Sequence, residues 1–107
     1  MESKTTKFIN CTNHPSTKWS ETQLNAAKAY GEIIDIPFPN VAPEATTGEI
    51  HTLAHRLFLT IVGYSKVGNT IVHIMGEMTV VCCVVRHLQQ VGIPCVASTT
   101  RRLARAY

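Results

Sequence analysis

Apolar residues in this chain gather in seven separate segments, which follow two different spacings. Four segments are short runs rich in apolar and β-branched residues, as is typical of buried strands. The other three are longer and are assigned as helices, the clearest of them by the three-and-four spacing of its apolar residues. The predicted strands are residues 7–11, 32–36, 70–75 and 93–97, and the predicted helices are residues 21–30, about 47–61 and 78–91. Because strands and helices alternate, the chain is predicted to have an α/β fold with a mainly parallel sheet and right-handed crossovers.

The first two predicted helices carry clear local signals. Ser20 and Gln23 form a capping-box pattern before the first helix, and Trp19 and Leu24 occupy the positions of a hydrophobic staple. The second helix starts near Thr47, and its apolar residues share one face: Ile50, Leu53, Ala54, Leu57, Phe58 and Ile61. Both segments are therefore assigned as helices.

The segment that follows Gly76 has two interpretations. Residues 78–85 are β-branched enough to form a strand that would pair with residues 70–75 in a hairpin. We favour a helix over residues 78–91, because apolar character continues along the whole segment and Gly92 stands where a helix would end. In this interpretation Gly76 supplies the backbone freedom for a sharp reversal, and the helix start offers N–H groups to an anion such as phosphate.

Of the possible strand orders we favour 2-1-3-4, which gives a small Rossmann-like three-layer fold with about four strands and three helices. This order places a switch point between the first and third strands, and ligands of open α/β sheets bind at such points, outside the carboxyl ends of the strands. With 107 residues, the chain is long enough for one hydrophobic core and too short for two. Residues 1–107 are therefore expected to form one domain.

Composition limits where the protein is expected to act and what it is expected to bind. Hydrophobic residues make up 45% of the chain, yet no apolar run approaches the length of about 18 residues expected of a membrane span. Phe8 and Ile9 are followed directly by polar residues, so the N-terminus lacks the apolar region of a signal peptide. We therefore expect a cytoplasmic protein that binds neither a membrane nor duplex nucleic acid.

The cysteines lack the spacing of a metal site, and the one pair of histidines that could bind a metal lacks a third ligand. The four cysteines include no Cys-x-x-Cys pair and are interpreted as buried reduced thiols: Cys11, Cys82, Cys83 and Cys95. His51 and His55 lie four residues apart on the second helix, but no third ligand accompanies them. The sequence therefore predicts no metal and no cofactor.

The net charge of +3 is modest, but it is unevenly distributed. Five of the seven acidic residues fall between Glu21 and Glu49, whereas the segment from Arg56 to the end holds six basic residues and one acid, Glu77. Three arginines close the sequence: Arg101, Arg102 and Arg105. Taken alone, this basic end is interpreted as a solvated tail.

Three loops at the carboxyl ends of strands one, three and four should emerge together, because the carboxyl ends of parallel strands share one edge of the sheet. The loops are Asn13-His14-Pro15-Ser16, Gly76-Glu77-Met78-Thr79 and Ser98-Thr99-Thr100-Arg101-Arg102. They offer hydroxyls, a histidine, a carboxylate, helix N–H groups and guanidinium groups, which suit phosphate and ribose. Each side chain also has a structural interpretation: His14 and Ser16 in a turn, Glu77 at a helix dipole and Thr79 as a helix cap.

In its single-domain layout and these three loops, the chain resembles the small CRISPR-associated Rossmann-like (CARF-like) proteins. The resemblance covers most of the chain and rests on His14-Pro15-Ser16, Gly76-Glu77-Met78-Thr79 and Ser98-Thr99-Thr100-Arg101. It implies binding of a cyclic oligoadenylate at the axis of a homodimer, and several stand-alone members are ring nucleases that open this messenger without metal. Because no effector domain is attached, a degrading enzyme or a ligand sink is implied rather than a sensor with its effector.

The sequence thus leads to one functional expectation and two alternatives. We expect a homodimeric ring nuclease of CRISPR antiviral defence, which cleaves cyclic oligoadenylate to a linear product with a 2′,3′-cyclic phosphate. The expected catalytic residues are His14, Glu77, Arg101 and Arg102, and the expected ligand-binding residues are Asn13, Ser16, Gly76, Met78, Thr79, Ser98, Thr99 and Thr100. The alternatives are a non-catalytic nucleotide-binding module, and a protein-interaction domain that uses the apolar face of residues 80–85.

Overall fold

A computed structural model describes residues 6–65, 69–98 and 104–106 of the chain. The strands are β1 (Thr6–Cys11), β2 (Glu32–Asp35), β3 (Asn69–Ile74), β4 (Cys95–Ser98) and β5 (Ala104–Ala106). The α-helices are α1 (Glu21–Lys28), α2 (Thr47–Tyr64) and α3 (Met78–Gln90), and a short 3-10 helix spans Ser16–Lys18.

The sheet has the order β2-β1-β3-β4-β5, and its first four strands are parallel. The predicted order 2-1-3-4 and the Rossmann-like α/β class are therefore confirmed. The additional strand, β5, pairs antiparallel with β4 and includes Arg105. The interpretation of this segment as a solvated tail is wrong for residues 104–106, which instead pair with the edge of β4.

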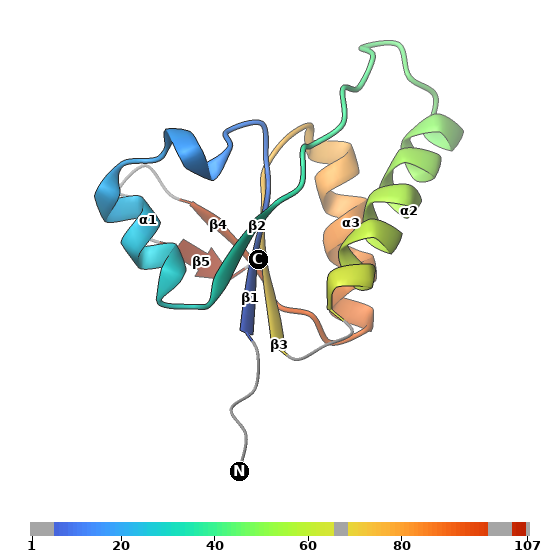
Figure 1. Ribbon diagram of the computed structural model, residues 1–107. Helices are drawn as coiled ribbons and strands as arrows, with labels where there is room; N and C mark the ends of the chain where they lie inside the picture. The colour runs from blue at the N-terminus through green and yellow to red at the C-terminus, as the bar shows by residue number, and fades with distance from the viewer. Residues whose placement is uncertain (1–5, 66–68, 99–103, 107) are drawn as a thin grey trace.

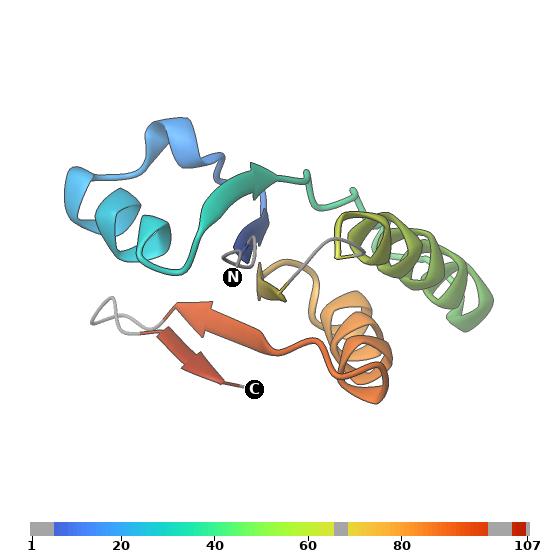
Figure 2. The same cartoon turned by 60° about the horizontal axis from the view of Figure 1, so that its bottom comes forward.

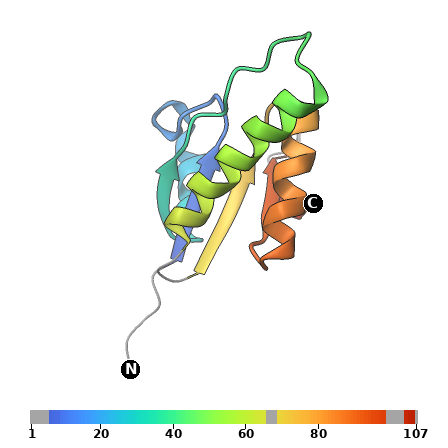
Figure 3. The ribbon, with the colours of Figure 1, turned by 90° about the vertical axis from the view of Figure 1, so that its right-hand side faces the viewer.

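The three helices cover the two faces of the sheet unequally. α1 lies on one face, whereas α2 and α3 lie side by side on the other (Figure 1). Figure 2 shows these layers with the sheet between them, and Figure 3 shows α2 and α3 in front of the sheet. The larger core cluster fills the space under α2 and α3, and a smaller one around Phe8 and Val96 lies on the α1 face.

The segment after Gly76 is helical, so the hairpin alternative is wrong. α3 buries one side of the helix against the core through Val80, Val81, Val84, Val85 and Leu88. Leu88 lies two turns beyond Val80, which is why apolar character extends past the length of a typical strand. The four valines at residues 80–85 that we considered as a partner surface are thus buried within the fold. Cys82 is exposed and Cys83 is partly buried, so the interpretation of all four cysteines as buried thiols is wrong for these two.

Helix caps fix where α2 and α3 begin. Thr46 and Glu49 form a complete capping box at α2, in which each side chain accepts a hydrogen bond from the backbone N–H of the other residue. At α3 the cap is Glu77, whose carboxylate accepts from the Val80 N–H at 3.0 Å. Thr79, which we considered as the cap, instead donates its hydroxyl hydrogen to Glu77.

Gly76 is required for its small size rather than for the backbone freedom that the sequence suggested. A Cβ atom at this position would lie 2.4 Å from Cδ2 and Cε2 of Phe38, which is buried in the main core. The described glycines with positive φ are Gly31 and Gly92. The close approach of Gly76 brings the connection that follows β2 against the start of α3.

Candidate functional site at the carboxyl edge of the sheet

A row of polar side chains crosses three strands near their carboxyl ends. Asn10 of β1 is in register with Asp35 of β2 on one side and with His73 of β3 on the other. The Asn10 amide donates to Asp35 Oδ1 at 2.8 Å, and Asn10 Oδ1 lies 3.2 Å from His73 Nδ1. The three side chains therefore form one hydrogen-bonded chain from an exposed carboxylate to a buried imidazole.

The loop that follows β1 folds back onto this row. The second hydrogen-bond acceptor of the Asn10 amide is the His14 carbonyl oxygen, at 3.0 Å, which also accepts from Trp19 Nε1 at 3.0 Å. Thr12 donates to Asn10 Oδ1 and accepts from the His14 N–H, both at 3.0 Å. The backbone at His14 is thus held from three directions, although the His14 side chain itself is exposed.

Ser16 belongs to the same network. Its hydroxyl donates to Asp35 Oδ2 at 2.8 Å, and its backbone N–H donates to Asp35 Oδ1 at 3.1 Å. These two bonds join the short 3-10 helix to the end of β2. Ser16 is therefore placed in the polar network, whereas we predicted it as a direct ligand contact.

The row borders a cavity of about 350 Å³, here called the His73 cavity. It is lined by Thr12, His14, Lys18, Trp19, Gln23, His73 and Met75. Trp19 is half-buried and offers an aromatic surface, Lys18 offers a positive charge, and the two histidines offer groups able to transfer protons. These are groups suited to a ligand that combines an aromatic base with a phosphate.

The environment of His73 favours a neutral ring. The side chain is only 5% exposed and lies between Phe8, with ring centroids 6.0 Å apart and planes at 23°, and Trp19, with centroids 6.0 Å apart in an edge-on arrangement. Burial lowers the pKa of His73, because the charged imidazolium loses its hydration. A neutral imidazole can accept a proton, which a catalytic base must do.

Asp35, in contrast to His73, favours its ionised form. Its partial burial disfavours the ionised carboxylate, but hydrogen bonds from the Asn10 amide and from the hydroxyl and N–H of Ser16 outweigh this effect and lower the pKa of Asp35. The row therefore ends in a negative charge that is separated from His73 by the Asn10 amide.

Glu77 and Thr79 line a different cavity, on the face of the sheet that carries α2 and α3. This Glu77 cavity has a volume of about 400 Å³ and also includes His51, Cys83 and residues of the connection from β2 to α2. The Glu77 carboxylate is held by the Thr79 hydroxyl and by the Val80 N–H, and these bonds lower the pKa of Glu77. His14 and Glu77 thus follow the same sheet edge, as predicted, but they line cavities on opposite faces.

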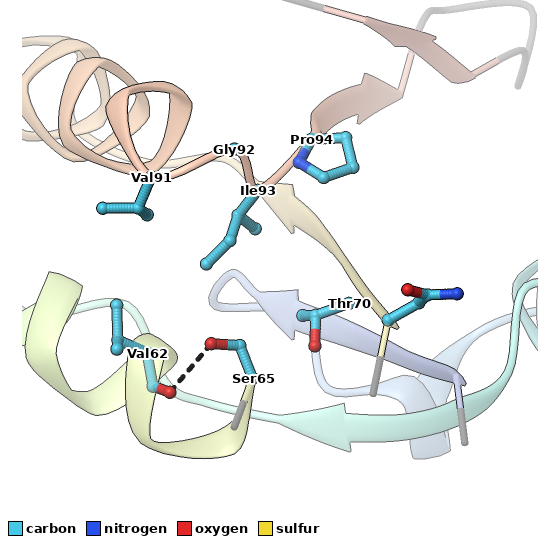
Figure 4. A pocket seen from close by; sticks show the side chains of 8 residues that line it. Val62, Ser65, Thr70, Val91, Gly92, Ile93 and Pro94 are labelled. Atoms are coloured by element: carbon cyan, nitrogen blue, oxygen red, sulfur yellow. Dashed lines mark hydrogen bonds between the residues drawn. The ribbon is translucent and has the colours of Figure 1, made fainter. Parts of the chain in front are cut away.

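A third cavity lies at the other end of the sheet, between the carboxyl ends of α2 and α3. Its volume is about 410 Å³, and Figure 4 shows Val62 and Ser65 facing Val91 and Ile93 across it. Thr70 also lines it, and its buried hydroxyl oxygen has no hydrogen-bond partner among the residues that the structure describes. None of the eight lining residues is titratable, so this cavity lacks the proton-transfer groups of the His73 cavity.

The remaining predicted site residues are less constrained or lie outside the described part of the chain. Asn13 and Met78 are exposed, and Gly76 packs against Phe38. Ser98 is the last residue of β4. Four predicted residues lie outside the described ranges: Thr99, Thr100, Arg101 and Arg102. Within the described ranges, no three His, Cys, Asp or Glu side chains come together as a metal-binding group.

Four residues of the polar network were not predicted from the sequence: Asn10, Thr12, Asp35 and His73. Asn10, Asp35 and His73 each interrupt an apolar strand at or next to its carboxyl end. A polar residue at that position of a buried strand is a signal that could have identified them, since parallel register then aligns them in one row.

Comparison with known proteins gives one match. A family model described as Uncharacterized protein MJ1673 family matches residues 6–107. No curated protein and no solved structure matches the chain. No helix in the described part of the chain combines the length and the apolar character needed to cross a membrane.

Proposed function

The chain belongs to the MJ1673 family, and we propose that it is a metal-independent ring nuclease that opens cyclic oligoadenylate at the His73 cavity. The observation that carries this proposal is the buried His73, which is hydrogen-bonded to Asn10 and lines a cavity together with Lys18 and Trp19. We further propose that the protein acts in the cytoplasm, in the CRISPR defence pathway implied by the resemblance.

The proposed reaction is an internal phosphoryl transfer. His73 takes the proton of a ribose 2′-hydroxyl, whose oxygen attacks the adjacent phosphorus while the bond from phosphorus to the 5′-oxygen breaks. The leaving 5′-oxygen takes a proton from solvent, and His73 returns its proton to solvent. The products are a 5′-hydroxyl and a 2′,3′-cyclic phosphate, so no external nucleophile is consumed.

The other side chains of the cavity suit the remaining parts of the ligand. Trp19 offers a surface on which adenine can stack, an interaction typically worth about 1–3 kcal/mol per base. Lys18 can bind the phosphate and stabilise charge that develops on its oxygens. Arg101 and Arg102 are proposed for the same charge, and His14 for orientation of the ribose.

The size of the cavity supports a homodimer. Pockets for drug-sized ligands typically have volumes of about 300–1,000 Å³, and the His73 cavity, at about 350 Å³, is at the lower end of that range. It suits one nucleotide unit, whereas a cyclic ligand with several units requires matching cavities on two copies. A two-fold assembly provides such a pair, and sedimentation equilibrium with and without ligand tests for it.

The decisive experiment is incubation of the purified protein with a panel of cyclic oligonucleotides in EDTA, followed by chromatography and mass spectrometry of the products. We expect linear products with a 2′,3′-cyclic phosphate. His73→Gln should lower the turnover about 100-fold or more, equivalent to about 2.7 kcal/mol. His55→Gln is the matched control, because His55 is exposed on α2, which lies on the other face of the sheet, and it does not line the cavity. Normal turnover by His73→Gln would exclude His73 as the base.

A binding-only role is the second candidate, and the burial of His73 favours it. With only 5% of the side chain exposed, His73 has limited access to a bound ribose. In that case the protein would sequester the messenger rather than cleave it. Stoichiometric binding by calorimetry without product formation would distinguish this role from turnover.

A further inference from the structure

The Asn10 side chain is fixed in one orientation by its hydrogen bonds. Both hydrogens of its amide group have acceptors, Asp35 Oδ1 at 2.8 Å and the His14 carbonyl oxygen at 3.0 Å. Its carbonyl oxygen faces the Thr12 hydroxyl at 3.0 Å and His73 Nδ1 at 3.2 Å. Asn10 is 1% exposed, so water cannot replace these partners.

A flipped amide would lose these contacts. Its oxygen would then face the Asp35 carboxylate and the His14 carbonyl oxygen, neither of which can donate a hydrogen bond. Asp35 decides the orientation most strongly, because a hydrogen bond to an ionised carboxylate is about twice as strong as one between neutral groups. The orientation of Asn10 therefore depends on a residue at the edge of the sheet.

This orientation determines which nitrogen of His73 carries the proton. Asn10 Oδ1 can only accept, so the hydrogen bond at His73 Nδ1 requires an N–H at that nitrogen. In a neutral ring the basic lone pair is then on Nε2. We infer that Asn10 and Asp35 are positioning residues for His73, which hold its neutral ring in the Nδ1–H tautomer.

An amide at position 10 has an effect that a carboxylate would not have. A carboxylate directly against Nδ1 would stabilise the imidazolium and raise the pKa of His73. The amide fixes the ring in the same way but carries no charge, and the Asp35 charge lies on its far side. The row therefore orients the base without protonating it. The catalytic meaning of this inference rests on the proposed function, but the tautomer does not.

The tautomer can be measured directly, without any ligand. Ring ¹⁵N chemical shifts of His73, from two-dimensional NMR of the ¹⁵N-labelled protein above neutral pH, should show Nδ1 protonated, although free histidine prefers the Nε2–H form. Asn10→Leu keeps a similar volume and removes the acceptor, so His73 should move toward the Nε2–H form. The Thr12 hydroxyl loses Asn10 Oδ1 as an acceptor in this variant but keeps the His14 carbonyl oxygen, at 3.2 Å, so it is not left without a partner.

A second variant keeps the test valid if Asn10→Leu does not fold. Asp35→Ala alters an exposed residue and leaves the Asn10 amide able to flip, so a mixture of tautomers is expected. Glu32→Ala is the matched control, because it removes the other β2 carboxylate, which contacts Lys7 at 3.3 Å and not Asn10. The control should keep the wild-type ring shifts. An Nε2–H tautomer in the wild type, or unchanged shifts in both Asn10→Leu and Asp35→Ala, would overturn the inference.

Kinetics separate this inference from the proposed function. If the wild type opens cyclic oligoadenylate, Asn10→Leu should lower kcat about 100-fold with KM little changed, and Asp35→Ala should lower it less. Wild-type activity with unchanged kcat in both variants would refute the positioning role while the ring-nuclease proposal stands. If the ring shifts behave as expected but the wild type cleaves no cyclic oligonucleotide, the positioning of His73 is supported and the proposed function fails.

Discussion

The contact between Gly76 and Phe38 allows one substitution to be tested at two positions with opposite expected results. At Gly76 a new Cβ atom would lie 2.4–2.6 Å from three ring carbons of Phe38. Because this ring is 4% exposed and packed in the core, it cannot move away without disturbing its neighbours. Overpacking of this kind typically costs about 1–3 kcal/mol, so Gly76→Ala should lower the free energy of unfolding by about that amount.

Gly63→Ala should have the opposite effect. Gly63 lies within α2 and is exposed. Apart from its chain neighbours and the backbone of its own helix, no atom of the described residues lies within 4 Å of the position where its Cβ would be. Alanine is favoured over glycine inside a helix by about 0.8–1.0 kcal/mol. Urea unfolding followed by circular dichroism should therefore give a lower midpoint for Gly76→Ala and a higher one for Gly63→Ala. A Gly76→Ala protein as stable as the wild type would refute the close packing of Phe38 at the start of α3.

Three further predictions concern caps, cysteines and pH. Thr46→Ala removes the α2 capping box and should cost about 1 kcal/mol in urea unfolding, whereas Thr52→Ala, which removes only a bond to the Gly48 carbonyl, should be nearly neutral. Burial raises the pKa of Cys11 to about 12 and of Cys95 to about 11, so iodoacetamide at pH 8 should label exposed Cys82 in the native protein and these two only after unfolding, as peptide mass spectrometry will show. Burial lowers the pKa of His73, so as the pH falls below about 6.5 the unfolded state binds more protons than the folded state. The free energy of unfolding should therefore fall with decreasing pH in this range, and it should fall less steeply in His73→Gln.

The fold was predictable because its signals are local and repeated. Alternating strands and helices determine a parallel sheet, and the apolar residue Leu88 distinguishes a helix from a hairpin because it lies beyond the length of a short strand. β5 was missed because the three residues Ala104–Ala106 are too few to show a period. Its formation depends on the edge of β4, which is a tertiary property.

The candidate site was predictable only in part, because loops at one edge of a sheet can pack on either of its two faces. The sequence indicates that the loops after β1 and β3 lie at the same edge, but it does not show that His14 and Glu77 line different cavities. That separation depends on how α1 and α3 pack on the two faces of the sheet. The register of Asn10 with Asp35 and His73 is likewise a property of three paired strands and not of any one segment.

The polar row also raises the question of why it is present at all. Parallel strands covered by helices are typically apolar throughout, and replacing both partners of a buried hydrogen bond by apolar groups of similar shape can be nearly neutral or stabilising. Asn10, Thr12 and His73 are nevertheless buried in mutually satisfied hydrogen bonds. Burial alone therefore does not explain these three residue types, because apolar side chains are the usual filling of such a sheet. What an apolar row could not provide is a neutral imidazole with a defined basic nitrogen beside Lys18 and Trp19, which is what the proposed proton transfer needs.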